Sequence, residues 1–406
     1  MLPRGRRFGV GRSRAPSPFG VAEQHVDRQE PTLRRPRSMP TPVRAGLVVL
    51  LLYGFLVGVA LLEVGIAELG EDFTSGLLDR VANPLSGLFA GLLFTVLVQS
   101  SSVSTATIVG LVGAGTVPLD LAVPMIMGAN IGTTVTNTLA ALGNIRRPRE
   151  FELGFSAALL HDFFKLMAVA ILLPLELATG WLVQSSTWLT GHLRGTEVSE
   201  IGSSPIRTAV KVPVEAITDL VRSMGLLSVV VAIILLALGL GLIFGALGML
   251  TKNMRQLVAG GVERAMNTVI GKGGGSLGIL VGVLVTIAVQ SSSITTAILV
   301  PLVASGVLTL RNAYPVTLGA NIGTTVTALL ASLAVLRPEG LTIALVHTLF
   351  NLAAIAIIYP ISAIRDLPLK ASVWTARVAT KHRTLVLAYV LGTFIVVPVI
   401  GVFLLS

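Results

Sequence analysis

Cysteine is absent from this chain of 406 residues. Its absence excludes disulfide bonds, thiolate metal sites and catalysis by a cysteine nucleophile. Charged residues are also scarce, at 12% of the chain, which is about half their share in soluble domains. Aromatic residues make up only 5% of the chain. This composition excludes an ordinary soluble globular protein.

Hydrophobic residues make up 53% of the chain, and many of them lie in long apolar segments. These segments are 47–66, 125–142, 153–175, 224–247, 316–336, 341–364 and 385–405. At ~1.5 Å of rise per residue, each is long enough as a helix to cross a hydrocarbon core of ~30 Å. The sequence therefore predicts an all-α polytopic membrane protein, embedded in lipid.

The N-terminal segment 1–44 differs from the rest of the chain. It holds ten arginines against three acidic residues, and so carries +7 of the net charge of +10. It is rich in proline, glycine and serine and has no apolar core of a signal peptide. We expect a disordered basic tail on the cytoplasmic side. Binding to anionic lipid headgroups is the alternative, and nucleic-acid binding is not expected because aromatic residues are nearly absent from the segment.

The remaining chain contains two copies of one unit. "QSSS" at 99–102 recurs at 290–293, and with the same offset "GANIGTTVT" at 128–136 recurs at 319–327. Between 99–142 and 290–333, 25 of 44 positions are identical. A third pair of segments, "LLHDFFKLMAVAILLP" and "LVHTLFNLAAIAIIYP", follows in the same order.

The number of crossings predicts how the two units are related. The first unit has three expected crossings, near 47–66, 120–142 and 153–176, and its QSSS segment contains the glycines and polar residues expected of a re-entrant hairpin. Three crossings place the second unit in the membrane with opposite polarity, so we predict an inverted-topology repeat. The expected organisation is a tail (1–44), transmembrane repeat 1 (45–180), an extracytoplasmic connector (181–223), transmembrane repeat 2 (224–365), and a basic loop with a final transmembrane helix (366–406).

The charges of the connecting segments give an orientation. Segments 143–152, 251–275 and 365–383 are rich in lysine and arginine, whereas the connector 181–223 is balanced. By the positive-inside rule, the first three lie in the cytoplasm and the connector lies outside. The expected location is a multi-pass protein of the cytoplasmic membrane with a cytoplasmic N-terminus.

The repeated polar motifs require a reason at membrane depth. Irregular backbone survives there only where protein or a water-filled cavity surrounds it. We expect both GANIGTT segments to be broken helices, because their glycines permit an unwound backbone. Carbonyl, hydroxyl and amide oxygens at such breaks suit Na⁺, whereas N–H groups at a helix N-terminus suit an oxyanion. Close packing of small residues in lipid is the alternative explanation, but it does not require Gln and Asn at matched positions in both copies.

These motifs resemble the type II sodium–phosphate cotransporter family. The resemblance rests on "QSSS", "GANIGTTVTNT", "LHDFFK" and the second "QSSS…YPVTLGANIGTTVTALLASL", and it covers about residues 45–365. It implies that the two QSSS motifs line the substrate pathway and that inorganic phosphate moves with Na⁺. The short connector without an N-x-[ST] site differs from vertebrate members and fits a bacterial one.

The resemblance also implies site residues. The expected phosphate ligands are Ser100, Ser101, Ser102, Ser291, Ser292, Ser293, Thr133 and Thr324. The expected Na⁺ ligands are Gln99, Asn130, Thr134, Gln290, Asn321 and Thr325.

Ionisable residues lie near the start of one predicted helix. We expect His161 and Asp162, with His347 and Asn351 in the second copy, to support the site, either as structural clamps between helices or as a brace with an extra cation site near Asp162. Asp162 and Lys165, three residues apart, can pair with each other. No arginine or lysine lies inside either motif, so co-bound Na⁺ would supply the charge that a buried phosphate needs.

The sequence thus predicts Na⁺-coupled uptake of inorganic phosphate by alternating access, with Na⁺ as coupling ion and no other cofactor. A Na⁺-coupled carrier of another oxyanion, such as sulfate or a carboxylate, and a passive anion channel stay open as alternatives. An enzyme is not expected, because the sequence has no nucleophile–base pair, Walker A motif or metal-ligand cluster. The sequence gives no oligomeric state.

Overall fold

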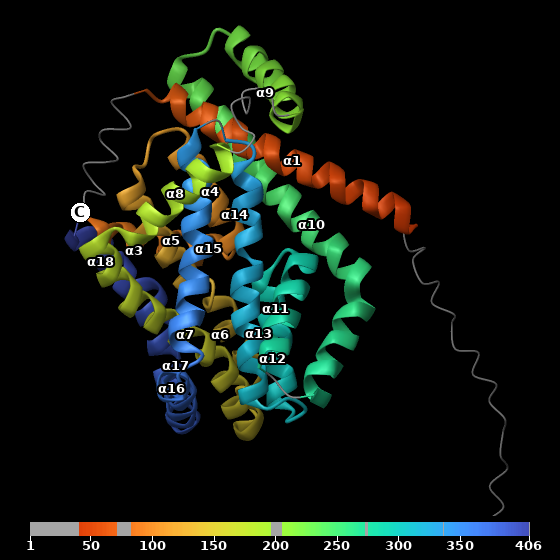
Figure 1. The fold of residues 1–406 in the computed structure, drawn as a ribbon, viewed down its shortest axis with the longest axis vertical. Coiled ribbons are helices and arrows are strands. Elements are labelled where there is room, and N and C mark those ends of the chain that lie inside the picture. The colour runs from red at the N-terminus through yellow and green to blue at the C-terminus, as the bar shows by residue number, and fades with distance from the viewer. Residues whose placement is uncertain (1–39, 71–82, 196–204, 273–274, 336, 406) are drawn as a thin grey trace, which may run out of the picture. The chain divides into compact units, whose positions relative to one another are not determined.

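The computed structural model describes residues 40–70, 83–195, 205–272, 275–335 and 337–405 (Figure 1). The helices of the first half are α1 (Thr41–Glu68), α3 (Pro84–Val98), α4 (Ser101–Gly113), α5 (Leu119–Gly132), α6 (Val135–Ala141), the short 3₁₀ helix η1 (Leu142–Asn144), α7 (Pro148–Thr179), α8 (Trp181–Gly195) and α9 (Pro205–Ser223). Those of the second half are α10 (Ser228–Lys272), α11 (Ser276–Val289), α12 (Ser292–Ala304), α13 (Leu310–Gly323), α14 (Thr325–Ser332), α15 (Pro338–Ile358), α16 (Ser362–Lys381), α17 (Arg383–Leu391), the π-helical turn η3 (Gly392–Val396) and α18 (Val397–Leu405). The described residues contain no strand.

Five helical stretches of the described chain are long and apolar enough to cross a membrane. They are Pro42–Glu68, Pro148–Thr179, Ser228–Met254, Pro338–Ile358 and Arg383–Leu405. The all-α polytopic prediction is confirmed. The apolar segments 125–142 and 316–336 do not form single long helices, because each is divided between two shorter helices.

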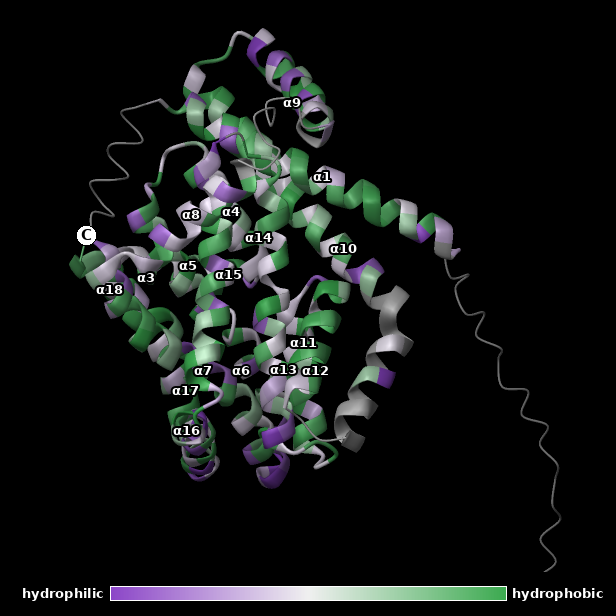
Figure 2. Ribbon diagram, viewed as in Figure 1, coloured by the Kyte–Doolittle hydropathy of each residue, from purple (hydrophilic) through white to green (hydrophobic). Residues whose placement is uncertain are grey.

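The surface of these helices is that of a lipid-embedded protein. Leu227, which directly precedes α10, and Phe403 and Leu404 of α18 are each more than three-quarters exposed. Figure 2 shows apolar residues along most of α1, the first half of α10, α17 and α18, and more polar residues on α9 and α16. Exposed apolar side chains in such number need lipid around them.

Two segments that the sequence predicted as basic loops are helical. Helix α10 continues without interruption to Lys272, through most of the predicted loop 251–275, and the predicted loop 365–383 is largely α16. Helix α10 continues beyond its apolar span, whereas α16 is a separate helix that follows α15. The predicted tail 1–44 lies mostly outside the described residues, and its last residues already belong to α1.

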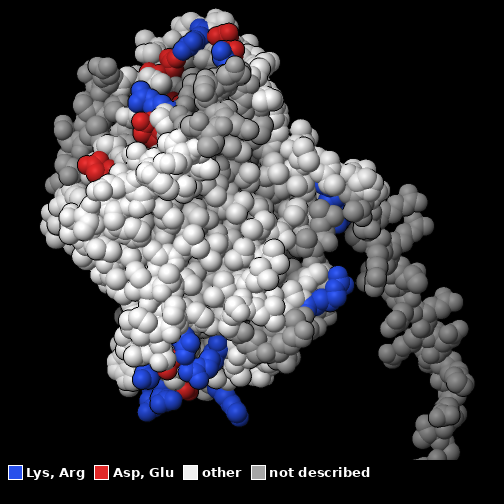
Figure 3. Space-filling model, in the orientation of Figure 1, with Lys and Arg blue, Asp and Glu red and all other residues white. Residues whose placement is uncertain are grey.

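Charge is distributed unevenly between the two ends of the described helices. Figure 3 shows lysine and arginine gathered at the end where α16 lies, whereas acidic and basic groups are mixed around α9. Helix α9 is fixed to α1 by a hydrogen bond from the Tyr53 hydroxyl to the Ala209 carbonyl, at 2.7 Å, and by an ion pair between Arg222 and Glu68. Glu68 accepts a hydrogen bond from Arg222 and carries a negative charge, and both effects raise the pKa of Arg222 above its ordinary value.

Glycines bring two helix pairs into unusually close contact, once in each copy. A Cβ placed on Gly128 of α5 would lie 1.8 Å from the Leu88 carbonyl oxygen of α3. A Cβ on Gly319 of α13 would lie 1.9 Å from the Ile279 carbonyl oxygen of α11. No side chain fits at either position, so glycine is required for α3 to pack on α5 and for α11 to pack on α13.

The corresponding helices of the two copies end beside different partners. Gly113, the last residue of α4, packs against Val335, which follows α14. Ala304, the last residue of α12, packs against Gly154 near the start of α7. Near the start of α15, Thr342 exchanges a hydrogen bond of 3.0 Å with Thr190 of α8, which follows the end of α7. Helices α7 and α15 therefore run in opposite directions. The inverted relation between the whole repeats stays a prediction.

Candidate functional site

Each QSSS motif interrupts a helix pair at its glutamine. Gln99 has φ = 56° and Gln290 has φ = 55°, and they are the only residues other than glycine with positive φ in the described chain. The left-handed conformation costs a residue with a Cβ about 1–2 kcal/mol. Such strain persists only where the surrounding structure requires it and is frequent at functional sites. The same strained residue type at both breaks marks the QSSS motifs as functional candidates.

The first serine of each motif begins the next helix. Ser100 Oγ accepts a hydrogen bond from the Val103 N–H, and Ser291 Oγ accepts one from the Ile294 N–H, both at 3.3 Å. Helices α4 and α12 thus begin inside the protein with serine caps. Their N-terminal N–H groups carry partial positive charge. These N-termini are able to attract an anion.

The remaining QSSS residues differ in exposure. Ser101, Ser102 and Ser292 are buried, whereas Ser293 is half-buried. Gln290 is half-buried, but Gln99 is exposed and borders a pocket of about 510 Å³ formed by α3, α6, η1 and the α17–η3 segment. Each glutamine donates to a carbonyl of its own helix and accepts a hydrogen bond of 3.4 Å from a threonine of the GANIGTT segment in its copy. Among the described residues, no hydrogen bond joins the serines of the two QSSS motifs.

Each GANIGTT segment is divided between two helices, but the linking threonines keep right-handed helical backbone angles and not the unwound backbone expected from the glycines. Two residues, Thr133 and Thr134, separate α5 from α6, whereas a single residue, Thr324, separates α13 from α14. The polar residues of both segments are buried: Asn130, Thr133, Thr134, Asn321, Thr324 and Thr325. Several threonine hydroxyls donate to carbonyls of their own helix, as Thr133 Oγ1 does to Ala129 at 3.0 Å. Buried hydroxyl and amide oxygens of this kind are ligands for a hard cation.

A buried lysine joins the two copies. Lys165 of α7 is 1% exposed, and its Nζ lies 2.5 Å from Asn130 Oδ1 of α5. The same Nζ lies 2.8 Å from Asn351 Oδ1 of α15. Asn130 belongs to the first GANIGTT motif, and Asn351 belongs to the second copy. A single ammonium group therefore bridges both halves of the chain.

His161 makes the second bridge between the copies. Its Nε2 lies 2.8 Å from Asn321 Oδ1 of α13, and its Nδ1 lies 3.1 Å from Asn137 Nδ2 of α6. Asn137 Oδ1 in turn accepts a hydrogen bond of 2.9 Å from Thr296 Oγ1 of α12. Because Asn321 offers an oxygen and Asn137 offers an N–H, these contacts assign the proton of a neutral His161 to Nε2.

Asp162 lies on the other side of α7. Its Oδ2 accepts hydrogen bonds from Thr138 Oγ1, at 3.1 Å, and from the Tyr389 hydroxyl of α17, at 3.0 Å. Its Oδ1 is buried and has no hydrogen-bond partner in the described part of the chain. The predicted pairing of Asp162 with Lys165 is wrong. Although the two residues are three apart, Lys165 points to α5 and α15, and Asp162 points to α6 and α17.

Other buried polar atoms of this interior also have no partner. Ser292 Oγ, Asn321 Nδ2 and His347 Nδ1 form no hydrogen bond within the described residues. His347 is 1% exposed, and its carbonyl accepts a hydrogen bond of 2.8 Å from Asn351 Nδ2. Buried donors and acceptors are normally satisfied, so a group of unpaired ones in both copies calls for a ligand or water.

Sequence reasoning missed some residues of this network. Lys165 was considered only as a partner of Asp162, although it contacts a motif residue. Asn137 follows the repeated nine letters directly, but its counterpart in the second copy is Ala328, so the repeat gave no signal. Tyr389 lies in the final helix, outside both repeats, and no pattern in the sequence linked it to Asp162.

The described residues offer oxygen ligands rather than a clustered metal site. Among them, no group of three or more His, Cys, Asp or Glu side chains could hold a metal ion. The buried polar atoms come mainly from hydroxyl and amide groups and from one ammonium group, Lys165. Such a set suits weakly held monovalent ions and an oxyanion, and not a tightly bound transition metal.

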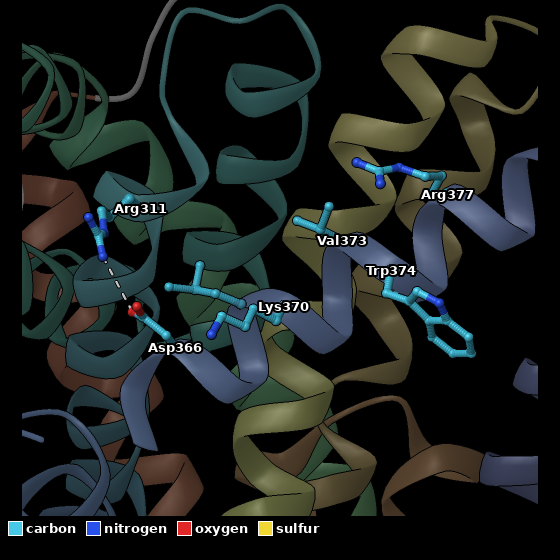
Figure 4. Close-up of a pocket in the computed structure, with 7 residues that line it drawn as sticks. Arg311, Asp366, Lys370, Val373, Trp374 and Arg377 are labelled. Atoms are coloured by element: carbon cyan, nitrogen blue, oxygen red, sulfur yellow. Dashed lines mark hydrogen bonds and ion pairs between the residues drawn. The ribbon is translucent and has the colours of Figure 1, made fainter. Parts of the chain in front are cut away.

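A separate basic pocket lies at the surface (Figure 4). It has a volume of about 390 Å³ and is lined by Arg311 of α13 and by residues of α16 that include Lys370 and Arg377. Arg311 reaches Asp366 across 3.4 Å, and Trp374 is 67% exposed. None of the QSSS or GANIGTT residues lines this pocket. It is therefore a surface feature distinct from the buried network.

Comparison with known proteins agrees with the motif pattern. The Na⁺/Pi-cotransporter family matches residues 55–184 and 242–367, which contain both copies of the QSSS and GANIGTT motifs. The sodium-dependent phosphate transport protein 2A of Ovis aries is 32% identical over 456 aligned residues, covering 94% of this chain and 71% of that protein. The protein of the same name from Rattus norvegicus is 31% identical, again over 94% of this chain and 71% of its own length.

A second group of relatives carries the name sodium-dependent phosphate transport protein 2B. The Homo sapiens protein is 32% identical over 445 aligned residues, which cover 87% of this chain and 64% of that protein. No solved structure gives a significant match. The family match extends over more than half of the chain, and it includes every motif residue described above. The chain therefore belongs to the Na⁺/Pi-cotransporter family.

Proposed function

We propose that this chain is a secondary transporter that couples uptake of inorganic phosphate to entry of Na⁺. The observation that carries the proposal is the buried network at Lys165 and His161, where motif residues of both copies meet in one polar interior. Family membership and the names of the relatives, which are sodium-dependent phosphate transport proteins, support the choice of ions.

The QSSS serines are the proposed phosphate ligands. The N-termini of α4 and α12 begin at these serines and present N–H groups and hydroxyls, which are the donors that an oxyanion needs. Thr133 and Thr324, buried at the two GANIGTT breaks, add further hydroxyls. Donors from both copies would share one phosphate ion.

The proposed Na⁺ ligands are the oxygens of Gln99, Gln290, Asn130, Asn321, Thr134 and Thr325. The buried ones lie at or near the helix breaks of the two GANIGTT segments. The unpartnered Oδ1 of Asp162 supports the alternative that this residue holds a further cation. The other alternative is that Asp162 holds no ion and only clamps α7 to α17.

Transport would proceed by alternating access. The bridges at Lys165 and His161 run between helices of the two copies, so a rocking motion of one copy against the other changes the same contacts that hold the site. The basic end of the described helices is assigned to the cytoplasm, which places the N-terminus inside the cell and the connector outside.

Uptake of radiolabelled phosphate into proteoliposomes tests the proposal. An inward Na⁺ gradient should drive phosphate above its equilibrium concentration, and replacement of Na⁺ by choline should abolish the accumulation. Sulfate and succinate should not compete at equal concentration. Competition by either anion would favour the carrier of another oxyanion. Phosphate flux that only equilibrates and ignores Na⁺ would favour the passive channel.

A further inference from the structure

In the described part of the chain, Lys165 contacts amide oxygens and has no acidic partner. Its Nζ donates to Asn130 Oδ1 and Asn351 Oδ1. The ion pairs of the described chain do not include Lys165. A buried ammonium group without a counter-ion costs several kcal/mol. A residue that carries this cost in the centre of the protein needs a compensating negative charge at some stage of the cycle.

The oxygens around Lys165 are those that the proposed function assigns to Na⁺. Asn130 is one of the expected Na⁺ ligands, yet its Oδ1 already faces the ammonium group at 2.5 Å. In the second copy, Asn321 Oδ1 faces His161, which these contacts leave neutral. Among the described residues, a lysine thus faces the asparagine of the first copy, whereas a histidine faces the asparagine of the second.

The repeat shows the same asymmetry at the lysine position. Lys165 of "LHDFFK" corresponds to Asn351 of "VHTLFN", so the second copy has a neutral amide where the first has an ammonium group. The two side chains contact each other at 2.8 Å. If both copies had a neutral amide at this position, their oxygens would be able to bind a mobile cation. Lys165 replaces that mobile cation by a covalently attached one.

We infer that Lys165 is a tethered cation that takes the place of one coupling Na⁺, so that this chain moves one Na⁺ fewer per phosphate than a variant with a neutral residue at position 165. The inference rests on the proposed Na⁺-coupled function. A phosphate anion needs compensating positive charge in the buried site. A positive charge attached to the protein reduces the number of ions that must bind with phosphate.

The substitution that restores the neutral half is Lys165→Asn, which copies the residue of the second repeat. Proteoliposomes with a tenfold Na⁺ gradient and membrane potential clamped at zero should show phosphate accumulation at equilibrium that is about tenfold higher than for the wild type, because each extra coupled ion multiplies the ratio by the gradient. The Hill coefficient for Na⁺ should rise by about one. Lys165→Arg, which keeps the charge, should leave both values unchanged.

Lys370→Gln is the matched control for a lost positive charge. Lys370 lines the surface pocket of Figure 4 and no motif residue lies there, so its loss should not alter the accumulation ratio. An unchanged ratio and Hill coefficient in Lys165→Asn would overturn the inference. A wild-type protein without Na⁺-dependent uptake would instead refute the proposed function, before any variant is compared.

A binding measurement decides the case in which Lys165→Asn no longer transports. Phosphate affinity of the purified variant should depend more steeply on Na⁺, with the slope of log Kd against log [Na⁺] larger by about one ion. Lys165→Gln, which keeps more of the side-chain length, replaces Lys165→Asn if the latter does not fold. Failure of a folded variant to bind phosphate at any Na⁺ concentration would contradict the inference, because a replaceable charge should be recovered by Na⁺.

Discussion

Lys165 Nζ lies 2.8 Å from Oδ1 of Asn351, the residue that occupies its own position in the second copy of the repeat. The contact joins α7 of the first copy to α15 of the second, so it lies where the two halves of the chain meet. A change at either residue acts on both copies at the same time.

Replacing the strained glutamines should separate stability from transport. Gln99→Gly and Gln290→Gly each remove a side chain from a left-handed residue, which should stabilise the protein by about 1 kcal/mol if other contacts are unaffected. The same variants, like the corresponding alanine variants, should abolish Na⁺-coupled phosphate uptake, because the amide is lost. Thermal unfolding in detergent and uptake into proteoliposomes measure the two effects. Normal transport by either single variant would exclude a shared role for that glutamine.

The close glycine contacts should not tolerate a methyl group. Gly128→Ala and Gly319→Ala place a Cβ against a backbone carbonyl and should destabilise the protein by about 1–3 kcal/mol or more. Gly245→Ala in α10 is the control, because a Cβ there meets nothing within 4 Å. That substitution should be neutral or slightly stabilising, by up to ~1 kcal/mol. Equal unfolding temperatures for Gly128→Ala and Gly245→Ala would contradict the close approach.

Removal of one hydroxyl should reveal the role of the final helix. Tyr389→Phe deletes the hydrogen bond to Asp162, and a typical hydrogen bond contributes about 0.5–1.5 kcal/mol. We expect uptake at limiting Na⁺ to fall at least several-fold. Tyr53→Phe also deletes a tyrosine hydrogen bond, but one on the connector side, and should leave uptake unchanged. The Na⁺ dependence of initial rates is the measurement, and similar rates for both variants would show that α17 has no part in the site.

The N-terminal tail should be dispensable for transport. Deletion of residues 2–40 should leave uptake per inserted protein within about twofold of the wild type, because no expected site residue lies there. Membrane insertion and topology should be measured together with uptake. A protein that inserts with the opposite orientation would show that the arginines of the tail determine the topology.

Na⁺ and phosphate should bind with positive coupling. A coupling free energy of ~1–3 kcal/mol corresponds to a gain of roughly 5–150-fold in affinity, and phosphate must raise Na⁺ affinity by the same factor. Purified protein is titrated with phosphate at several NaCl concentrations, with choline added to keep ionic strength constant, since screening also depends on salt. A phosphate Kd independent of Na⁺ would favour the passive channel over symport.

Features that depend on local pattern were predictable from the sequence. The division of both GANIGTT segments between two helices was predicted from the repeat, whereas the left-handed glutamines and the serine caps were found only in the structure. The apolar spans follow from the length of their hydrophobic segments. Helix α16 and the last part of α10 were predicted as loops, because charge alone does not distinguish a helix at the membrane surface from a loop.

The contacts within the candidate site could be identified only from the three-dimensional structure. Asp162 and Lys165 are neighbours on one helix, and a local rule pairs them, yet tertiary partners separate them. Lys165 finds Asn130 and Asn351, which are 35 and 186 positions away in the chain. Tyr389 reaches Asp162 over a separation of 227 positions. No periodicity or motif encodes contacts at such distances.

The glycine contacts also determine which parts of the protein are able to move. Because the Leu88 carbonyl occupies the place of a Gly128 side chain, α3 cannot slide along α5 without losing this fit, and the same holds for α11 and α13. We therefore expect each pair to travel as one rigid body during transport. The bending must then occur at the helix breaks, where Gln99 and Gln290 hold the backbone. Since the chain has no native cysteine, paired probes can be placed on these bodies to follow the bending directly.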